Sequence, residues 1–254
     1  MKQVTTLVLA GQRAGVVDPL CAEFDVEYKV ETPILGRPML DWVERALETA
    51  ELTRPYMISG YPKAGEGWSI KESGKGPADS ALIALKNASF PCLMTTGDHP
   101  LLSAEMISSF VNGSIASGAD FCVGLANEAV IQDAYPKTKR TYLRFSDEAV
   151  SGCNLFFISN EKGLAALEFW KEAQHLRKQP LKLARKIGIG LGLRYAVGRL
   201  SLKGAFDEAG KKIGISAKPV LLPFAEAAID VDKVSDHQLV SEILKKRELS
   251  DENS

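Results

Sequence analysis

The sequence predicts an α/β fold in which a mostly parallel sheet is flanked by helices on both faces. Short apolar runs, typical of strands buried on both faces, alternate with amphipathic segments of 11 to 14 residues along the first half of the chain. The first run stops at a glycine, and the first long helical segment opens with a proline. Strands joined through helices run parallel, and such a sheet binds ligands at the carboxyl ends of its strands.

The first half predicts four strands separated by three helices. The apolar run Val4–Ala10 ends at Gly11, which closes the first strand. Pro38 presets the backbone angle φ of a first helical turn, and apolar residues follow at helical spacing, so a helix is predicted over Pro38–Ala50. The other predicted elements are the strand Tyr56–Ser59, the helix Pro77–Asn87, the strand Cys92–Thr96, the helix Ala104–Ser117 and the strand Asp120–Ala126.

The second half is less regular. Its predicted elements are the strands Thr141–Ser146 and Asn154–Ser159, a helix-rich stretch over Glu161–Lys212, the strand Pro219–Pro223 and a closing helix over Asp236–Lys246. We expect a single domain over residues 1–246, in which 160–217 is a basic helical insertion, followed by a flexible tail over 247–254.

The composition excludes several classes of protein. The 254 residues are 45% hydrophobic and 25% charged, as in an ordinary globular protein, and the net charge of −1 gives no general reason to expect nucleic acid as a partner. No apolar stretch approaches the ~20 residues that span a bilayer, and the short N-terminal run lacks a cleavage site, so we expect a cytoplasmic protein without a membrane span. The four cysteines lack the close pairing of zinc or redox motifs, which favours buried reduced thiols.

Charge is distributed unevenly along the chain. Residues 171–218 hold 12 lysines and arginines against three acids, so the rest of the chain carries a net charge of −10. This asymmetry indicates contact with something anionic, or simply a solvated face. Within it, cations alternate with apolar residues over Lys182–Tyr195, where three glycines weaken any helix. A homodimer contact or a covering subdomain is favoured there over peripheral contact with an anionic membrane surface.

Three features follow predicted strands, where a parallel sheet presents ligands. The first is the loop Leu9-Ala10-Gly11-Gln12-Arg13-Ala14-Gly15. A glycine directly after a buried strand permits a sharp turn, and the free amides of such a loop can cradle phosphate oxygens. The loop lacks the Gly-Lys-Ser/Thr of a P-loop and the third glycine of a dinucleotide fingerprint. Phosphate binding and an ordinary turn therefore both stay open for it.

The other two features are aspartates. Asp98, in Thr96-Gly97-Asp98-His99-Pro100, stands at a strand end between residues that fix the chain, so it is placed to bind Mg²⁺. Helix capping is the alternative, but Ser103 serves the following helix better. Asp230 and Asp232 precede the last helix and point the same way if the segment is extended, so either can bind the ion or cap the helix.

Five places along the chain carry a wider pattern. They are Leu9-Ala10-Gly11; Lys29 with Pro33-Ile34-Leu35-Gly36-Arg37-Pro38-Met39-Leu40; Gly76-Pro77-Ala78-Asp79-Ser80; Gly97-Asp98-His99-Pro100-Leu101-Leu102; and Asp230-Val231-Asp232 with Asp236. In this order they resemble the nucleotidyltransferases with a glycosyltransferase-A-like Rossmann fold, in particular the molybdenum cofactor guanylyl- and cytidylyltransferase-like group. The resemblance covers residues 1–126 and 218–246 and implies a Rossmann-like sheet of the nucleotide-diphospho-sugar transferase type.

The resemblance also implies a role for each motif. Lys29, which on a purely local reading is a solvated surface lysine, is implied to stabilise negative charge on the phosphates. Asp98 and Asp232, with Asp230 as a further candidate, are implied to bind Mg²⁺. The implied nucleotide contacts are Leu9, Ala10, Gly11 and Arg13 in the first loop, Gly76, Pro77 and Ser80 in the third motif, and Gly97.

The first loop departs from the family pattern. Gln12 and Ala14 stand in place of its second and third glycines, and Val16 stands where its arginine is expected. Arg13 is the candidate to replace that cation from a neighbouring position. Near the end of the chain, Lys233-Val234 replaces Thr-Pro, and the acids before it are retained.

The predicted acceptor-binding residues lie in a basic run and at a nearby asparagine. Residues 137–144 bring four cations just upstream of Asn154. An arginine offers a planar, two-pronged donor set for phosphate, so Arg140 and Arg144 are predicted to bind the acceptor's phosphate, with solvated surface charge as the alternative. Ser151-Gly152-Cys153-Asn154 loosely resembles the element at which related enzymes hold the acceptor or ribose, and a strand-end turn is the other interpretation of Asn154.

The sequence thus predicts a Mg²⁺-dependent nucleotidyltransferase. It would move a nucleoside monophosphate from a nucleoside triphosphate, CTP or GTP, to a small phosphorylated acceptor and release pyrophosphate. Two alternatives stay open. One is a glycosyltransferase of the same fold that consumes a nucleotide sugar, and the other is a non-catalytic nucleotide-binding module, motivated by the altered glycine loop. The sequence identifies neither the acceptor nor the base.

Overall fold

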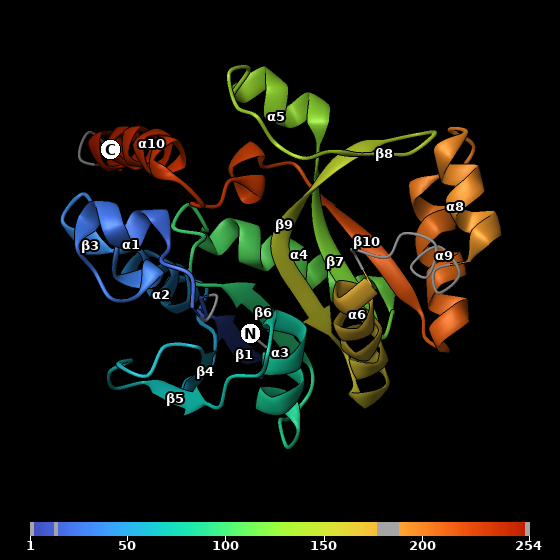
Figure 1. Cartoon of the computed structure of the whole chain (residues 1–254), viewed down its shortest axis with the longest axis horizontal. Coiled ribbons are helices and arrows are strands. Elements are labelled where there is room, and N and C mark those ends of the chain that lie inside the picture. The colour runs from blue at the N-terminus through green and yellow to red at the C-terminus, as the bar shows by residue number, and fades with distance from the viewer. Residues whose placement is uncertain (1–2, 13–14, 177–187, 252–254) are drawn as a thin grey trace.

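A computed structural model of the chain describes residues 3–12, 15–176 and 188–251, and Figure 1 shows a central sheet with helices on either side. The eight-stranded sheet has seven strands in the order β10-β7-β9-β6-β1-β4-β5, and the short strand β8 pairs with β9. Its strands are β1 (Thr5–Leu9), β4 (Tyr56–Ser59), β5 (Trp68–Lys71), β6 (Cys92–Thr96), β7 (Phe121–Asn127), β8 (Leu143–Arg144), β9 (Ala149–Ile158) and β10 (Ala217–Leu222). A separate two-stranded sheet joins β2 (Pro33–Ile34) to β3 (Arg37–Pro38).

The helices follow the strands in alternation. The α-helices are α1 (Pro19–Phe24), α2 (Met39–Thr49), α3 (Pro77–Leu85), α4 (Ala104–Ser117), α5 (Glu128–Ala134), α6 (Leu164–Leu176), α8 (Ile189–Ala196), α9 (Leu202–Ile213) and α10 (Val234–Asp251). Three short 3-10 helices are η1 (Lys29–Glu31), η2 (Glu161–Gly163) and η3 (Ala225–Ala228). None of the helices in the described ranges is both long and apolar enough to cross a membrane.

The sheet is mostly parallel, as predicted, with one long reversed strand. β1 lies parallel to β4 and β6, β4 lies parallel to β5, and β7 lies parallel to β10. β9 enters between β6 and β7 and runs antiparallel to both. The carboxyl ends of β1, β4 and β6 therefore meet at one edge of the sheet, where ligands bind in open α/β folds.

Alternate residues of the central strands face opposite helical layers. Val8, Ile58 and Leu93 pack with α2 and α4 in one apolar core. Their neighbours Leu7 and Met57 pack with α3, α6 and α9 in the other. Because successive side chains of a strand point to opposite faces, two helical layers are needed to bury continuous apolar runs. The predicted α/β class is confirmed.

Most elements lie where the sequence predicts them. β4, β6 and α4 have the predicted bounds, and β1, α2, α3, β7 and β10 differ from them by one or two residues. β9 begins at Ala149, five residues before the predicted start at Asn154. The edge strand β5 is not predicted, because its side chains are only partly buried or exposed and polar residues interrupt its apolar pattern.

The C-terminal tail is shorter than expected. Helix α10 continues to Asp251 rather than ending near Lys246. Arg247 holds this extension, because its guanidinium donates to the carbonyl of Leu101 at 3.0 Å and lies 3.9 Å from the carboxylate of Glu226. Of the expected tail, residues 252–254 lie outside the described residues.

Within the basic stretch 160–217, helices α6 and α9 cover one face of the sheet. Leu167 of α6 is fully buried in the second core, and Phe206 of α9 packs against that core. Lys171 of α6 pairs with Asp79 of α3 at 2.6 Å. Helix α8 forms although two of the glycines expected to weaken it lie within its bounds, and residues 182–187 of the same segment lie outside the described residues. That the stretch 160–217 is an insertion stays a prediction. A homodimer or membrane contact through Lys182–Tyr195 also stays a prediction.

Gly60, directly after β4, is required by close backbone packing. It has a φ of +96°, and a Cβ on it would lie 2.2 Å from the Cα of Gly11 in the loop after β1. We expect Gly60→Ala to lower the free energy of unfolding by about 2–6 kcal/mol, since left-handed strain and overpacking each cost about 1–3 kcal/mol. Urea denaturation tests this, with Gly118→Ala as control, because Gly118 has a φ of +62° but open space around it. Equal losses in both variants would assign the effect to strain alone.

Candidate active site

Backbone hydrogen bonds bring three distant segments together at the carboxyl edge of the sheet. Gly97 donates its N–H to the carbonyl of Leu9 at 2.9 Å, which holds the loop after β6 beside the loop after β1. Val231 donates its N–H to the carbonyl of Asp98, also at 2.9 Å, so the segment before α10 lies alongside the same loop. A Cβ on Gly97 would lie 2.8 Å from Cγ1 of Val30. Glycine therefore permits η1 to approach this edge.

Lys29 lies between two of the predicted aspartates. Its Nζ is 2.7 Å from Oδ2 of Asp98 and 2.7 Å from Oδ1 of Asp232. The side chain of Lys29 is 13% exposed and that of Asp98 is 22% exposed, whereas Asp232 is 67% exposed. The structure thus brings together all three residues of the predicted catalytic set. Lys29 is not a solvated surface lysine.

The charges of this group stabilise one another. Burial of Lys29 lowers its pKa, but the carboxylates of Asp98 and Asp232 outweigh burial and raise the pKa above that of a free lysine. Burial of the Asp98 carboxyl raises its pKa, but the ammonium of Lys29 holds that pKa below the ordinary aspartate value. At neutral pH the site therefore presents a protonated amine beside the ionised carboxylate of Asp98.

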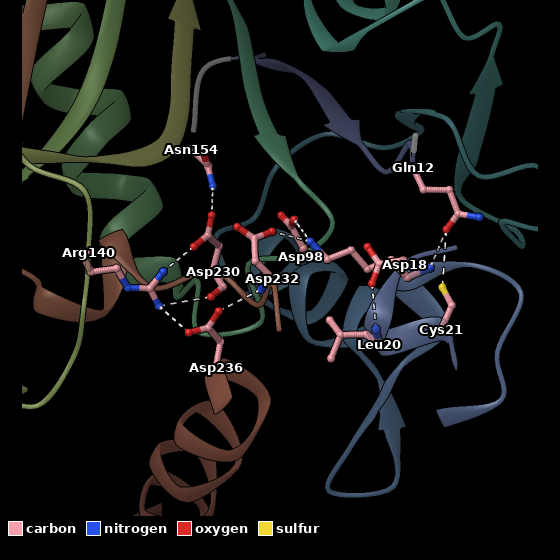
Figure 2. Close-up of polar contacts among 11 residues, drawn as sticks. Gln12, Asp18, Leu20, Cys21, Asp98, Arg140, Asn154, Asp230, Asp232 and Asp236 are labelled. Atoms are coloured by element: carbon pink, nitrogen blue, oxygen red, sulfur yellow. Dashed lines mark hydrogen bonds and ion pairs between the residues drawn. The ribbon is translucent and has the colours of Figure 1, made fainter. Parts of the chain in front are cut away.

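Gln12 fixes the position of Lys29. Its side-chain oxygen accepts a hydrogen bond from the backbone N–H of Lys29 at 3.1 Å, and its amide nitrogen donates to the carbonyl of Glu27 at 2.9 Å (Figure 2 shows Gln12 and its contact with Cys21). The residue that departs from the family's glycine pattern thus joins the first loop to the turn that carries the lysine. In the sequence Gln12 stands out only as a lost glycine, and no local pattern signals this tertiary role.

Asp230 faces a different cation from Asp232. Nη1 of Arg140 is 2.6 Å from Oδ1 of Asp230, and the side-chain amide of Asn154 donates to Oδ2 of Asp230 at 3.0 Å (Figure 2). Asp236 lies on the same side, since it is 3.8 Å from Nη2 of Arg140 and accepts the backbone N–H of Asp232 at 3.2 Å. Asp236 is part of the last motif of the family resemblance, but the resemblance implies no role for it. Its place in the first turn of α10, four residues after Asp232, is the sequence feature that indicates this contact.

The predicted acceptor residues divide into two groups. Arg140 and Asn154 both contact Asp230, and the Arg140 side chain is only 10% exposed. Arg144 is 66% exposed and forms a two-pronged contact with the carboxylate of Glu128, at 2.6 and 2.7 Å. The structure does not bring Arg144 into contact with the aspartates of the site. Binding of the acceptor by these residues stays a prediction.

The predicted nucleotide residues that the structure describes lie in three places: at and after the end of β1 (Leu9, Ala10, Gly11), at the start of α3 (Gly76, Pro77, Ser80) and directly after β6 (Gly97). Gly76 precedes the first turn of α3 and has no side chain to cap it, and Pro77 opens the helix. The hydroxyl of Ser80 accepts the backbone N–H of Gly74 at 2.9 Å, so it shapes this loop from within. Gly11 lies in van der Waals reach of Gly60. Arg13, the candidate replacement for the missing cation, lies outside the described residues.

The four cysteines are free thiols, and Cys21 contacts Gln12 of this site. Cys21, Cys92, Cys122 and Cys153 are all buried and unpaired, as predicted. Burial raises the pKa of the Cys92 thiol to about 12, so it is not a nucleophile at neutral pH.

Comparisons with known proteins agree with this fold. The family model of the MobA-like NTP transferase domain matches residues 8–186. A solved structure of a hypothetical transferase from Thermus thermophilus is 29% identical in sequence, with a TM-score of 0.80 over 92% of this chain and 99% of that one. A search of curated proteins finds no match.

Two more distant structures share the fold. One is 2-C-methyl-D-erythritol 4-phosphate cytidylyltransferase, also from Thermus thermophilus, 15% identical, with a TM-score of 0.52 over 96% of this chain and 99% of that one. The other is CMP:2-keto-3-deoxy-manno-octonic acid synthetase complexed with CTP, 11% identical, with a TM-score of 0.56 over 97% of this chain and all of that one, 100%. With the family match over most of the chain, these findings identify the protein as a nucleotidyltransferase that belongs to the MobA-like NTP transferase family.

Proposed function

We propose that this nucleotidyltransferase transfers a nucleoside monophosphate from CTP or GTP to a small phosphorylated acceptor and releases pyrophosphate. The observation that carries the proposal is the ammonium of Lys29 between Asp98 and Asp232 at the carboxyl edge of the sheet. CTP is the first nucleotide to test, since two proteins of the same fold are a cytidylyltransferase and a synthetase complexed with CTP.

The reaction requires alignment of two anions and neutralisation of charge. An oxygen of the acceptor's phosphate attacks the α-phosphorus and forms a new P–O bond, while the bond to the bridging oxygen breaks and pyrophosphate leaves with the electron pair. A buried cation such as Lys29 lowers the energy of the charge that develops on the phosphate oxygens. A phosphate oxygen can replace one carboxylate as its hydrogen-bond acceptor, which keeps the amine protonated throughout. No covalent nucleophile is needed.

Asp98 and Asp232 are the residues that would hold Mg²⁺. Oδ1 of Asp98 is buried and, among the described residues, has no hydrogen-bond partner. No three His, Cys, Asp or Glu side chains in the described part of the chain converge to hold a metal by themselves. Magnesium is commonly bound by one or two carboxylates, with waters and substrate phosphates as its other ligands, so these two aspartates fit it. When bound, the ion supplies neutralisation of phosphate charge.

The glycosyltransferase alternative predicts a different use of the site. Such an enzyme would need the acidic residues but not Lys29, whereas Lys29 is the residue that both acids contact. The lysine therefore favours transfer from a triphosphate over transfer from a nucleotide sugar.

Release of pyrophosphate is the direct test of the proposal. We expect one of CTP, GTP, ATP and UTP, combined with one member of a panel of phosphorylated small molecules, to give release that requires Mg²⁺ and is abolished by chelation with EDTA. The variant Asp98→Ala serves as the control for contaminating activity. Consumption of a nucleotide sugar, with no release from any triphosphate, would contradict the proposal and support the alternative.

A further inference from the structure

Arg140 and Asp230 form a second ion pair, two residues before Asp232, which pairs with Lys29. The carboxylate of Asp230 is 25% exposed and receives one hydrogen bond on each oxygen, from Arg140 on Oδ1 and from Asn154 on Oδ2. An arginine pair of this kind, largely removed from solvent, is stable only while both partners are present, since removal of one leaves an unpaired buried charge. Each carboxylate oxygen of Asp230 thus has a hydrogen-bond donor. Asp232, two residues later, is left to face Lys29.

We propose that Arg140 is a positioning residue, which holds Asp230 and Asp236 so that the carboxylate of Asp232 faces the reaction site. This role rests on the proposed function and goes beyond it. It also assigns to Arg140 and Asn154 a task other than binding the acceptor's phosphate.

Arg140 contacts residues on both sides of Asp232 along the chain. Its Nη1 binds the carboxylate of Asp230, and its Nη2 donates to the backbone carbonyl of the same residue at 3.3 Å. Nη2 also lies 3.8 Å from Asp236, whose other oxygen accepts the backbone N–H of Asp232 at 3.2 Å. One guanidinium therefore holds both Asp230, before Asp232, and Asp236, after it. Asp236 in turn accepts the backbone N–H of Asp232. A planar group with several fixed donors suits this task, whereas a lysine offers a single point of charge.

The local charge balance requires this arginine. The carboxylate of Asp230 has Arg140 as its ion-pair partner and the side-chain amide of Asn154 as its second donor. Lys29 is already shared between Asp98 and Asp232. Without Arg140, the carboxylate of Asp230 would keep the amide of Asn154 but lose its ion-pair partner, which would displace the segment that carries Asp232.

The backbone of Asn154 is shaped for its contact with Asp230. Asn154 lies within β9 but has a φ of +51°, in the left-handed region, and the pairing of β7 with β9 shifts register between Val123 and Leu125 on the opposing strand. Non-glycine residues in such a conformation cluster at functional sites, and a local irregularity in a strand can re-aim a side chain. At this irregularity the side-chain amide of Asn154 points toward Asp230 and departs from the regular alternation of side chains along β9.

A double-mutant cycle tests the role of Arg140. We expect Arg140→Met and Asp230→Asn each to lower kcat about 10²-fold, and the double variant to lose about the same rather than about 10⁴-fold, because it leaves no unpaired charge. The KM for the acceptor should stay within about threefold in every variant, since a positioning residue does not touch it. Arg194→Met breaks a pair with Glu208 that lies on helices α8 and α9, and should leave kcat unchanged.

Two further variants separate positioning from folding. Asn154→Gly removes the amide but suits the left-handed backbone, so we expect an unchanged thermal midpoint with kcat lowered about tenfold. Arg140→Lys keeps the charge and should lose at least about tenfold in kcat if the two-pronged geometry matters. Losses that multiply in the double variant, or a rise in acceptor KM alone for Arg140→Met, would overturn the role. No pyrophosphate release from the unsubstituted enzyme would instead contradict the proposed function itself, and this role with it.

Discussion

Replacement of Lys29 by methionine is expected to lower kcat/KM for pyrophosphate release by about 10³-fold, the scale observed when a preorganised cation or donor is removed from a phosphoryl-transfer or oxyanion site. Methionine matches the length of the lysine stem but carries no charge. The substitution also leaves Asp98 and Asp232, both within 2.7 Å of the lysine nitrogen, without their shared cation. Both the phosphate charge and the carboxylate charge then lack a partner.

Steady-state kinetics with the nucleotide and acceptor found in the release assay will check this result. Lys29→Arg is the matched control, because it keeps the charge and should recover part of the loss. A decrease below about tenfold for Lys29→Met would mean that the lysine only links the two aspartates and does not act on the phosphates. That outcome would favour the sugar-transfer alternative.

Replacement of Asp98 by asparagine is expected to abolish the dependence of the rate on Mg²⁺ and to lower kcat by about 10³-fold, since a neutral amide is a poor ligand for a hard divalent ion. Asparagine preserves the shape of the side chain and the backbone contact with Val231, so the fold should be retained. Titration of Mg²⁺ at saturating nucleotide measures the effect. Restoration of the full rate by excess Mg²⁺ would show that Asp98 contributes only affinity for the ion.

The same variant makes a prediction about pH and stability. The ammonium of Lys29 outweighs burial and depresses the pKa of Asp98 in the folded protein. A carboxyl of this kind stabilises the fold above its unfolded pKa, and the contribution is lost as the pH falls through the lower folded pKa. The difference in unfolding free energy between the unsubstituted enzyme and Asp98→Asn should thus be constant near neutral pH and shrink below about pH 4. Urea denaturation from neutral to acidic pH will measure it, and a difference that does not change with pH would contradict the proposed pairing.

The parts of the fold that follow from local patterns were predictable. β6 and α4 have the predicted bounds because a continuous apolar run and a helical apolar period each report burial directly. β5 was not predictable, since an edge strand is half-exposed and carries little apolar signal. The sequence predicts that this strand begins at Asn154, whereas β9 begins at Ala149 and continues through Asn154 as a left-handed residue. A bulge is specified by the partner strand, which local sequence does not contain.

The candidate site was predictable in its members but not in its pairings. The resemblance grouped Lys29, Asp98 and Asp232, and the structure brings them into contact. The local pattern does not distinguish Asp230 from Asp232, because two acids at alternate positions are equivalent in an extended segment, and the resemblance favours Asp232 without giving the partner of either acid. Their difference arises from Arg140 and Asn154, which approach one of the two from other parts of the chain.

The sequence by itself determined the order of strands and helices, the mostly parallel sheet and the edge of the sheet at which the candidate site lies. These properties depend on hydrophobic periodicity and on glycine and proline at element ends, which act over a few neighbouring residues. The tertiary structure alone decided which acid meets which cation. Lys29 contacts partners 69 and 203 residues away, and Arg140 contacts one 90 residues away. An ion pair depends on separations of a few ångströms in space, and only the folded chain sets these separations.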